Sequence, residues 1–183
     1  MSSEHVIVPP GAHRVNVLIA TADARALIGF LAQVFDAVED KSALAISEGD
    51  GKVFNSDVRL GDTHLNIFDR KQGWKHMPSL LQVYVKDMDD KLDRAVRLGA
   101  EIVTRPTDFY GGKLARFIDP QGNLWWLYEL FEEQPSDWSA SEGPEGEEAT
   151  DPEDNLWLAE GDDSMTYLHD SLVEGMKRLG QFE

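Results

Sequence analysis

The sequence contains no cysteine, which excludes disulfides, thiolate metal ligands and a cysteine nucleophile. No apolar run approaches the roughly 20 residues that are needed to span a bilayer. Residues 1–11 lack a basic stretch followed by an apolar one, so we expect no secretion signal. These absences together favour a cytoplasmic protein that does not contact a membrane.

Basic residues are also scarce, because 17 lysines and arginines stand against 34 aspartates and glutamates, for a formal net charge of -17. Nucleic acid is therefore a poor partner, since its phosphates need clustered basic side chains. No lysine or arginine occurs between Arg116 and Lys177, where acidic residues are frequent. The sequence favours a solvated acidic tail that maintains solubility, with attraction of a cationic ligand as the alternative.

An order of strand, helix, strand, strand, strand occurs twice. The first copy has a helix that Thr21 or Asp23 can cap and that ends near Phe35. Its strands are expected at residues 14–19, 43–47, 53–60 and 64–69. Residues 71–78 form a connector.

The second copy has a helix that Asp87 or Asp89 can cap and that ends near Leu98. Its strands are expected at residues 80–85, 101–105, 113–118 and 124–130, with a loop at residues 106–112. Residues 63–69 align with residues 123–129, and each segment follows a glycine-containing turn and ends in an aromatic residue and an acid. The repeat therefore predicts two βαβββ modules, at residues 14–70 and 79–131.

The parts outside the repeat have a different composition. We expect a mobile N-terminus at residues 1–13, an acidic linker at residues 132–163 rich in Pro, Gly and Ser, and a C-terminal helix at residues 164–183. The apolar residues of this segment that recur at helical spacing are Leu168, Leu172, Met176 and Leu179. This helix is expected to dock on the paired domain, residues 14–131, or on a second subunit.

One segment of the second module carries the most specific pattern. Phe109 begins the run Phe-Tyr-Gly-Gly, Arg116 follows, and Asp119 begins the run Asp-Pro-Gln-Gly-Asn-Leu-Trp-Trp. This segment resembles the vicinal oxygen chelate superfamily, the glyoxalase, bleomycin-resistance and dioxygenase fold, and in particular its PhnB-like branch. The resemblance covers about residues 14–130.

The resemblance implies an α+β fold in which the two modules form a cupped, mostly antiparallel eight-stranded sheet with helices outside. It also implies a small-molecule pocket between the modules and a homodimer. Whether the modules pair within one chain or are exchanged between two stays open. Because the fold hosts many activities, the resemblance does not by itself give a function.

Strand alternation assigns two unlike faces to four of the strands, the first and last of each module. One face is aliphatic and is expected to pack on the helices. The other combines amides, an imidazole and aromatic rings, as a small-molecule pocket does, although a half-solvated face is the alternative. The predicted ligand-binding residues, including one loop tyrosine that could close the pocket, are Asn16, Leu18, His64, Asn66, Phe68, Gln82, Tyr84, Tyr110, Trp126 and Tyr128. Trp125 is assigned to the core and Arg116 to a surface salt bridge.

The resemblance places the ligand positions of metal-dependent family members at Asn16, Asn66, Leu80 and Trp126. Leucine and tryptophan cannot ligate, and two amide oxygens make a weak transition-metal site. We therefore expect no metal and no cofactor. The inward set is also expected to contain no carboxylate, and its one imidazole, His64, is more simply a hydrogen-bonded histidine, so no catalytic residue is assigned.

These observations favour a metal-free binding protein for a partly aromatic ligand, with a cationic ligand as one option. One alternative is a metal-dependent lyase, isomerase or dioxygenase of the same superfamily, which would need Asn16, His64 and Asn66 to coordinate an ion with outside help. A second alternative is an interaction module whose tail recruits a partner. Activity is thus undecided, and the sequence leans away from an enzyme.

Overall fold

The three-dimensional structure is a computed structural model of the 183-residue chain, and it describes residues 8, 13–131 and 163–179. The predicted N-terminal segment and acidic linker therefore lie almost wholly outside the described residues. Within these ranges, no helix is long and apolar enough to cross a membrane.

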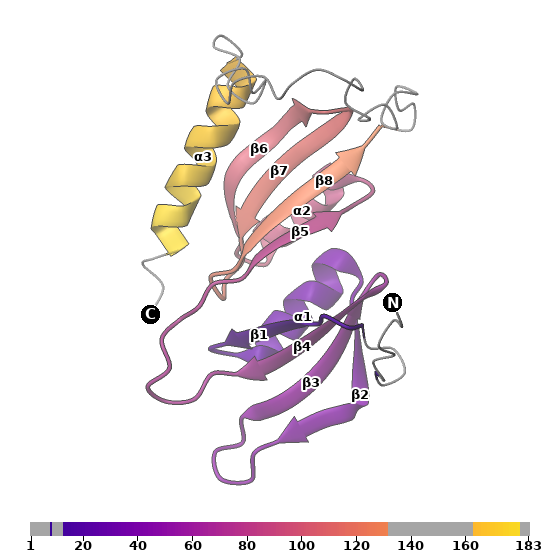
Figure 1. Ribbon diagram of the computed structural model, residues 1–183, viewed down its shortest axis with the longest axis vertical. Coiled ribbons are helices and arrows are strands. Elements are labelled where there is room, and N and C mark those ends of the chain that lie inside the picture. Colours follow the sequence, from indigo (N-terminus) through magenta and orange to yellow (C-terminus); the bar gives the residue numbers. More distant parts are fainter. Residues whose placement is uncertain (1–7, 9–12, 132–162, 180–183) are drawn as a thin grey trace, which may run out of the picture.

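The first module contains one helix and a four-stranded sheet (Figure 1). Its elements are β1 (Val17–Thr21), α1 (Ala24–Phe35), β2 (Val38–Ile46), β3 (Val53–Leu60) and β4 (Thr63–Asp69). The strand order is β1-β4-β3-β2, with β1 parallel to β4 and the other neighbours antiparallel. The first strand thus begins later than expected, and the second begins earlier.

The second module repeats this topology with the order β5-β8-β7-β6. Its elements are β5 (Leu80–Tyr84), α2 (Met88–Arg97), β6 (Glu101–Phe109), β7 (Gly112–Ile118) and β8 (Leu124–Leu130). Again the outer strand β5 is parallel to its neighbour β8. The α+β class and the two βαβββ modules are confirmed, and the eight strands form two four-stranded sheets.

The predicted loop at residues 106–112 is wrong, because β6 continues through Pro106 to Phe109. Proline lacks a backbone N–H, but β6 is an edge strand and its register with β7 shifts between Thr104 and Thr107, where such a residue is tolerated. The turn that follows consists of Tyr110 and Gly111, both with positive φ, which suits a tight hairpin.

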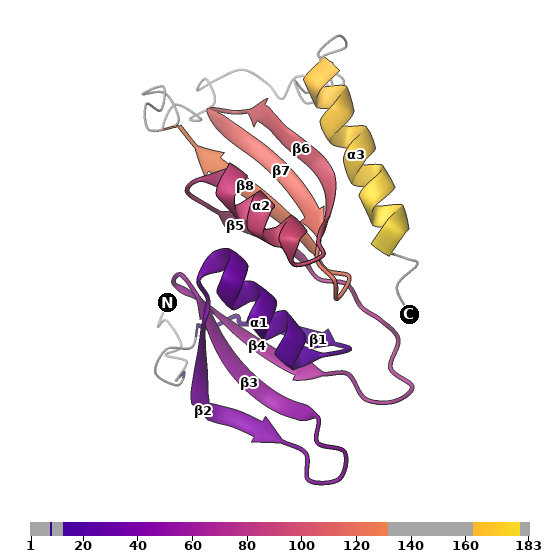
Figure 2. The same ribbon diagram turned by 180° about the vertical axis from the view of Figure 1, so that it is seen from behind.

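Helices α1 and α2 cover the same side of the two sheets and contact each other (Figure 2). Phe30 and Phe35 of α1 lie against Phe117 and Trp125 of the second sheet, with ring centroids 5.9 Å apart for Phe30–Phe117 and 5.3 Å for Phe35–Trp125. A salt bridge between Lys91 Nζ and Asp36 Oδ2, at 2.8 Å, also links the modules. One core therefore joins both modules through their helices.

The predicted helix-facing residues are almost all in this core. They are Val17, Ile19, Leu65, Ile67, Leu81, Val83, Val85, Trp125 and Leu127. Val15 is the exception, since it precedes β1 and is 85% exposed. Strand alternation thus separated the two faces of each sheet correctly.

The two predicted helix caps differ. The Asp23 carboxylate accepts a hydrogen bond from the Ala26 backbone N–H at 2.9 Å, so its capping of α1 is confirmed. Asp87 also precedes its helix, but its side chain makes no capping bond, and its backbone N–H donates to Glu129 Oε1 at 2.7 Å. Its left-handed backbone, with φ 58°, explains why the side chain cannot reach the first turn.

Replacing Asp23 with alanine removes the side-chain acceptor for an otherwise unpaired N–H of α1. We expect the free energy of unfolding to fall by about 1 kcal/mol. Urea unfolding of the variant measures this change, and Asp87→Ala is the matched control, with a smaller loss expected. Equal losses in the two variants would contradict the assignment of the caps.

The C-terminal helix α3 (Asp163–Leu179) packs against the second sheet on the face opposite α2. Its side chains contact Leu114 and Tyr128 at one end and Ile118 and Leu124 at the other, and these alternate with the residues that face the core. Figure 1 shows α3 beside the edge strand β6. The predicted helix and its docking on the body are therefore present.

Candidate ligand-binding site

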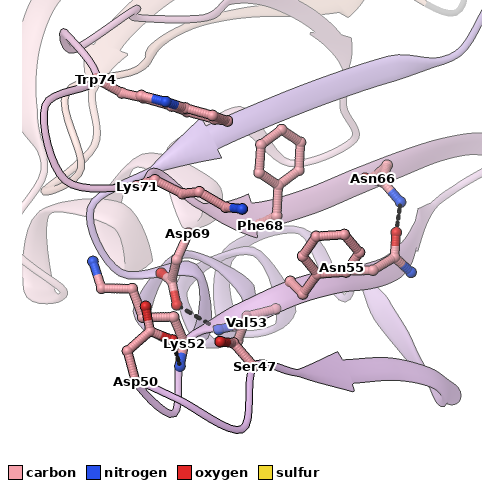
Figure 3. Close-up of a pocket in the computed structure, with 11 residues that line it drawn as sticks. Ser47, Asp50, Lys52, Val53, Asn55, Asn66, Phe68, Asp69, Lys71 and Trp74 are labelled. Atoms are coloured by element: carbon pink, nitrogen blue, oxygen red, sulfur yellow. Dashed lines mark hydrogen bonds between the residues drawn. The ribbon is translucent and has the colours of Figure 1, made fainter.

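The helix-free face of the first sheet carries a pocket of about 340 Å³ between β3, β4 and the connector that follows β4 (Figure 3). The residues that line it are Ser47, Asp50, Lys52, Val53, Phe54, Asn55, Asn66, Phe68, Asp69, Lys71 and Trp74. This volume lies within the range of pockets that hold small ligands.

Three aromatic side chains, Phe54, Phe68 and Trp74, line the pocket. Phe54 is 62% exposed and Trp74 is 51% exposed, so both side chains are partly open to solvent. The Phe68 and Trp74 rings meet edge to face, with centroids 6.5 Å apart and an interplanar angle of 87°. Lys71 Nζ lies 5.7 Å from the centroid of the Phe54 ring, and in Figure 3 its side chain extends below Trp74.

A polar network forms the part of the pocket nearest the middle of the sheet. Asn66 Nδ2 donates to Asn55 Oδ1 at 2.5 Å and to Asp57 Oδ1 at 2.8 Å. Farther along the same face, His64 Nε2 lies 3.8 Å from Asp57 Oδ2. The expectation that this face has no carboxylate is therefore wrong, because it rested on β1 and β4 and left out β3, where Asn55 and Asp57 alternate with the buried Ser56.

The other acidic residues of the pocket are held by the protein itself. Asp69 accepts hydrogen bonds from the Ala24 and Val53 backbone N–H groups, both at 2.7 Å, and so ties the start of α1 to β3 and β4. Hydrogen bonds from the Ser47 side chain and the Lys52 backbone N–H lower the pKa of the Asp50 carboxyl. Asp69 and Asp50 thus have local structural roles and offset the charges of Lys52 and Lys71.

The structure brings several predicted site residues of the first module together. Asn66 and Phe68 line the pocket, and Leu18, 64% exposed, pairs with Asn66 across the β1–β4 ladder. His64 lies on the same face, next to Asp57. Asn16 precedes β1, where its side-chain amide bonds the backbone of His13.

The predicted residues of the second module lie elsewhere. Gln82 and Tyr84 are exposed on β5, beside Trp126 and Tyr128 of β8. The Tyr128 hydroxyl lies 2.8 Å from the Phe109 carbonyl and 2.6 Å from the Tyr110 carbonyl, to which it donates. Burial raises the pKa of Tyr128, so its hydroxyl anchors the hairpin as a neutral donor.

The assignment of Arg116 to a surface salt bridge is wrong. Its side chain is on β7 and is only 3% exposed, with the guanidinium 3.9 Å from the centroid of the Trp126 ring. It lies beneath α3, where the Leu168 carbonyl accepts its hydrogen bond. The position of α3 could not be read from the sequence, so the burial of Arg116 could not be foreseen.

Sequence reasoning missed Phe54, Asn55, Lys71 and Trp74 of the pocket. Asn55 could have been found by applying strand alternation to β3. Trp74 and Lys71 lie in the connector, residues 71–78, where no periodicity indicates which way a side chain points. The one signal in the sequence for a pocket residue here is that an aromatic residue, Trp74, occurs in a polar connector.

The residues present do not fit the metal ion that some members of such a fold hold. Within the part of the chain that the structure describes, no group of three or more His, Asp or Glu side chains could bind an ion. His64 and Asp57 are adjacent but supply two donors, and the neighbouring Asn66 donates its amide nitrogen to Asp57. A catalytic transition-metal site commonly has three protein ligands.

Solved structures with the same fold include "TioX from Micromonospora sp. ML1", which has a TM-score of 0.50 and 20% identity over 67% of this chain and 100% of that chain. Protein PA1353 from Pseudomonas aeruginosa has a TM-score of 0.51 and 14% identity, over 65% of this chain and 98% of that one. A mutant of the fosfomycin resistance protein FosX from Listeria monocytogenes, complexed with Mn(II) and 1S,2S-dihydroxypropylphosphonic acid, has a TM-score of 0.47 and 17% identity, over 62% of this chain and 88% of that one. At these identities the likeness to the first two structures shows the fold alone, and nothing is argued from the third. No curated protein matches the sequence.

The match to a family covers both modules. The family profile described as "Glyoxalase/Bleomycin resistance protein/Dioxygenase superfamily" matches residues 12–127, from before β1 into β8. With the repeated βαβββ topology, this match shows that the chain belongs to the glyoxalase/bleomycin resistance protein/dioxygenase superfamily.

Proposed function

We propose that this protein binds a planar, partly aromatic small molecule on the helix-free face of the first module. The observation that carries the proposal is the pocket itself, in which Phe54, Phe68 and Trp74 stand around a polar patch formed by Asn55 and Asn66. An apolar lining with a few placed polar groups is typical of small-molecule sites. Assignment to the PhnB-like branch rests on the sequence signature and is part of this proposal.

The three rings define the shape of the ligand that fits. A flat ring that stacks on an aromatic side chain gains about 0.5 to 1.5 kcal/mol per contact beyond its burial. Asn66 Nδ2 donates both its protons within the protein and Asn55 Nδ2 donates one, which leaves Asn66 Oδ1 as an acceptor and the second Asn55 Nδ2 proton as a donor for an amide group on such a ring. A planar heterocycle or an aromatic amide therefore suits the pocket.

The local charges favour an uncharged ligand over the cation that the net charge suggested. Lys52 and Lys71 in the pocket lining are offset by Asp50 and Asp69. The ammonium group of Lys71 occupies the position over the Phe54 ring. This is where a ligand cation would gain the most binding energy. A ligand cation would have to displace this group.

The chemistry of the donors supports binding without a metal. The alternative, a metal-dependent lyase, isomerase or dioxygenase, needs a third strong ligand beside His64 and Asp57. Elemental analysis of protein purified without chelator separates the two hypotheses. We expect protein that binds the ligand to contain no stoichiometric transition metal. A stoichiometric transition metal would contradict the proposal.

We expect Trp74→Ala to weaken ligand binding at least tenfold, because it removes one wall of the pocket; a tenfold change corresponds to about 1.4 kcal/mol. A thermal-shift screen with quinoline, indole-3-acetamide and bleomycin first selects the probe, since a bound ligand raises the melting temperature by mass action. Isothermal titration of the selected compound then compares the parent chain with the variant. Trp74 is half exposed, so its replacement is expected to leave the fold intact.

Tyr84→Ala is the matched control, because Tyr84 is an exposed aromatic residue of the other module, at 65%. It should leave affinity within twofold of the parent chain. If Tyr84→Ala weakens binding as strongly as Trp74→Ala, the ligand contacts both modules, and the proposed site in the first module alone is wrong.

A further inference from the structure

Helix α3 occupies a particular surface of the second module. Leu168 is 4% exposed and packs with Leu114 and Tyr128, while Leu172 and Leu179 pack with Ile118 and Leu124. The Ser171 hydroxyl also lies 2.8 Å from the Thr104 hydroxyl of β6. Side chains from successive turns of α3 thus cover the β6–β7 side of this face along the length of the strands.

This surface is the counterpart, in the internal repeat, of the pocket face in the first module. Strand β8 corresponds to β4: β4 lies between β1 and β3, and β8 lies between β5 and β7. In this correspondence Trp126 takes the place of Asn66. In the first module the equivalent face is open and carries a pocket. In the second module the chain's own helix covers the part of this face over β6 and β7, while Leu80 and Tyr84 of β5 stay exposed.

A charged group with incomplete partners lies beneath the helix. Arg116 Nη1 donates to the Leu168 carbonyl at 2.8 Å and to the Thr104 hydroxyl at 3.1 Å. Arg116 Nε is buried without an acceptor, and among the described residues no carboxylate pairs with the guanidinium. Burial lowers the pKa of Arg116 to about 10.

A buried charge is costly unless an opposite charge neutralises it. The two acceptors of Arg116 are both neutral, and the flat face of its guanidinium already rests on Trp126. A guanidinium binds a carboxylate through two parallel hydrogen bonds, and this arrangement would also use the unpaired Nε. The site is therefore built for an anion that it does not receive from the described part of the chain.

We propose that Arg116 and Trp126 form a second ligand site, for a carboxylate on a flat apolar body, and that α3 occupies this site as an intramolecular competitor. The Leu168 carbonyl takes the place of the ligand carboxylate, and the Leu168 side chain takes the place of its apolar body. The ligand and the docked helix exclude each other, so binding requires α3 to leave the sheet. The apparent affinity is then the intrinsic affinity multiplied by the fraction of molecules in which α3 is undocked.

A reversible lock on α3 tests this proposal in the full chain. The sequence has no cysteine, and the Thr104 and Ser171 hydroxyl oxygens lie 2.8 Å apart, so the double variant Thr104→Cys/Ser171→Cys brings two thiols within reach of a disulfide. Binding of 1-naphthoate is measured by titration in the oxidised and the reduced protein. We expect the reduced form to bind at least tenfold more tightly. Equal affinities in the two forms, or no binding in either, would overturn the proposal.

Two further measurements assign the site and keep the test independent of the disulfide. Arg116→Gln in the reduced double variant should lose 1-naphthoate binding, whereas Trp74→Ala should retain it; the reverse pattern would place the probe in the first-module pocket instead.

Gly175→Val, whose added Cβ would lie 2.6 Å from Val103 Cγ1, should weaken docking of α3 and raise the affinity of the otherwise unaltered chain. Val173→Ala, on an exposed part of α3, is its control.

The matched cation 1-naphthylmethylamine has the same rings and the opposite charge. It should not distinguish the reduced from the oxidised protein. If it does so as strongly as 1-naphthoate, the surface under α3 binds apolar rings without regard to charge, and the role proposed for Arg116 is wrong.

Discussion

Asp119→Ala is expected to lower the free energy of unfolding by about 3 to 5 kcal/mol, the largest effect that we predict for a single substitution in this chain. The Asp119 carboxylate is 1% exposed and accepts four hydrogen bonds. They come from the Gln121 backbone N–H at 2.8 Å, the Asn123 backbone N–H at 3.0 Å, Asn123 Nδ2 at 2.9 Å and Trp125 Nε1 at 2.8 Å. Alanine would leave three buried donors and one part-buried donor without this acceptor.

The loss should reach both modules, because the turn that Asp119 holds also contacts the first one. Gln121 Oε1 accepts hydrogen bonds from the Thr21 hydroxyl at 3.1 Å and from the Asp23 backbone N–H at 3.2 Å. Urea unfolding measures the change, with Asp62→Ala in the exposed turn between β3 and β4 as the control. A loss below about 1 kcal/mol for Asp119→Ala would mean that the carboxylate does not organise the turn.

Gly112→Ala is expected to destabilise the protein by about 2 to 4 kcal/mol. A Cβ at Gly112 would lie 2.3 Å from the Glu129 carbonyl oxygen, which is backbone and cannot move without disturbing the β7–β8 ladder. The two glycines of the Phe-Tyr-Gly-Gly run are thus required for different reasons. Gly111 has a positive φ, and Gly112 lies close to the backbone of the neighbouring strand β8.

Gly29→Ala is the matched control, because Gly29 is inside α1 and an added Cβ there would meet nothing within 4 Å. It should raise the free energy of unfolding by about 0.5 to 1 kcal/mol, since alanine favours the helix. Thermal unfolding of the two variants is therefore expected to move the melting temperature in opposite directions. A stable Gly112→Ala variant would contradict the described contact between β7 and β8.

The repeated module could be predicted because its signals are local and regular. Helical spacing in α1, the capping residue Asp23 and the alternation of Leu65 and Ile67 with polar residues each depend on near neighbours in the chain. The same alternation identified which side of each sheet faces the helices. It also placed Asn66 and Phe68 on the side that carries the pocket.

The missed features depend on contacts between distant segments. Pro106 reads as a strand terminator, but in an edge strand its missing N–H faces no partner strand. The spacing of Leu168 and Leu172 shows that α3 has an apolar face but not which surface covers it. Trp74 enters the pocket from a connector that has no period.

The two modules share a topology but differ at the sheet face opposite α1 and α2. The first face is open and has an aromatic pocket with the polar residues Asn55 and Asn66. The second is covered over β6 and β7 by α3, which packs over Arg116. We therefore propose that, in the docked state, the ligand binds to the first module.

An NMR titration of the tryptophan indole N–H signals tests this assignment most directly. The chain has five tryptophans, so these signals are few, and Trp74→Phe and Trp126→Phe identify the two that matter. On addition of the compound selected by thermal shift, the Trp74 signal should move and the Trp126 signal should stay in place. Movement of the Trp126 signal with no change at Trp74 would contradict the assignment.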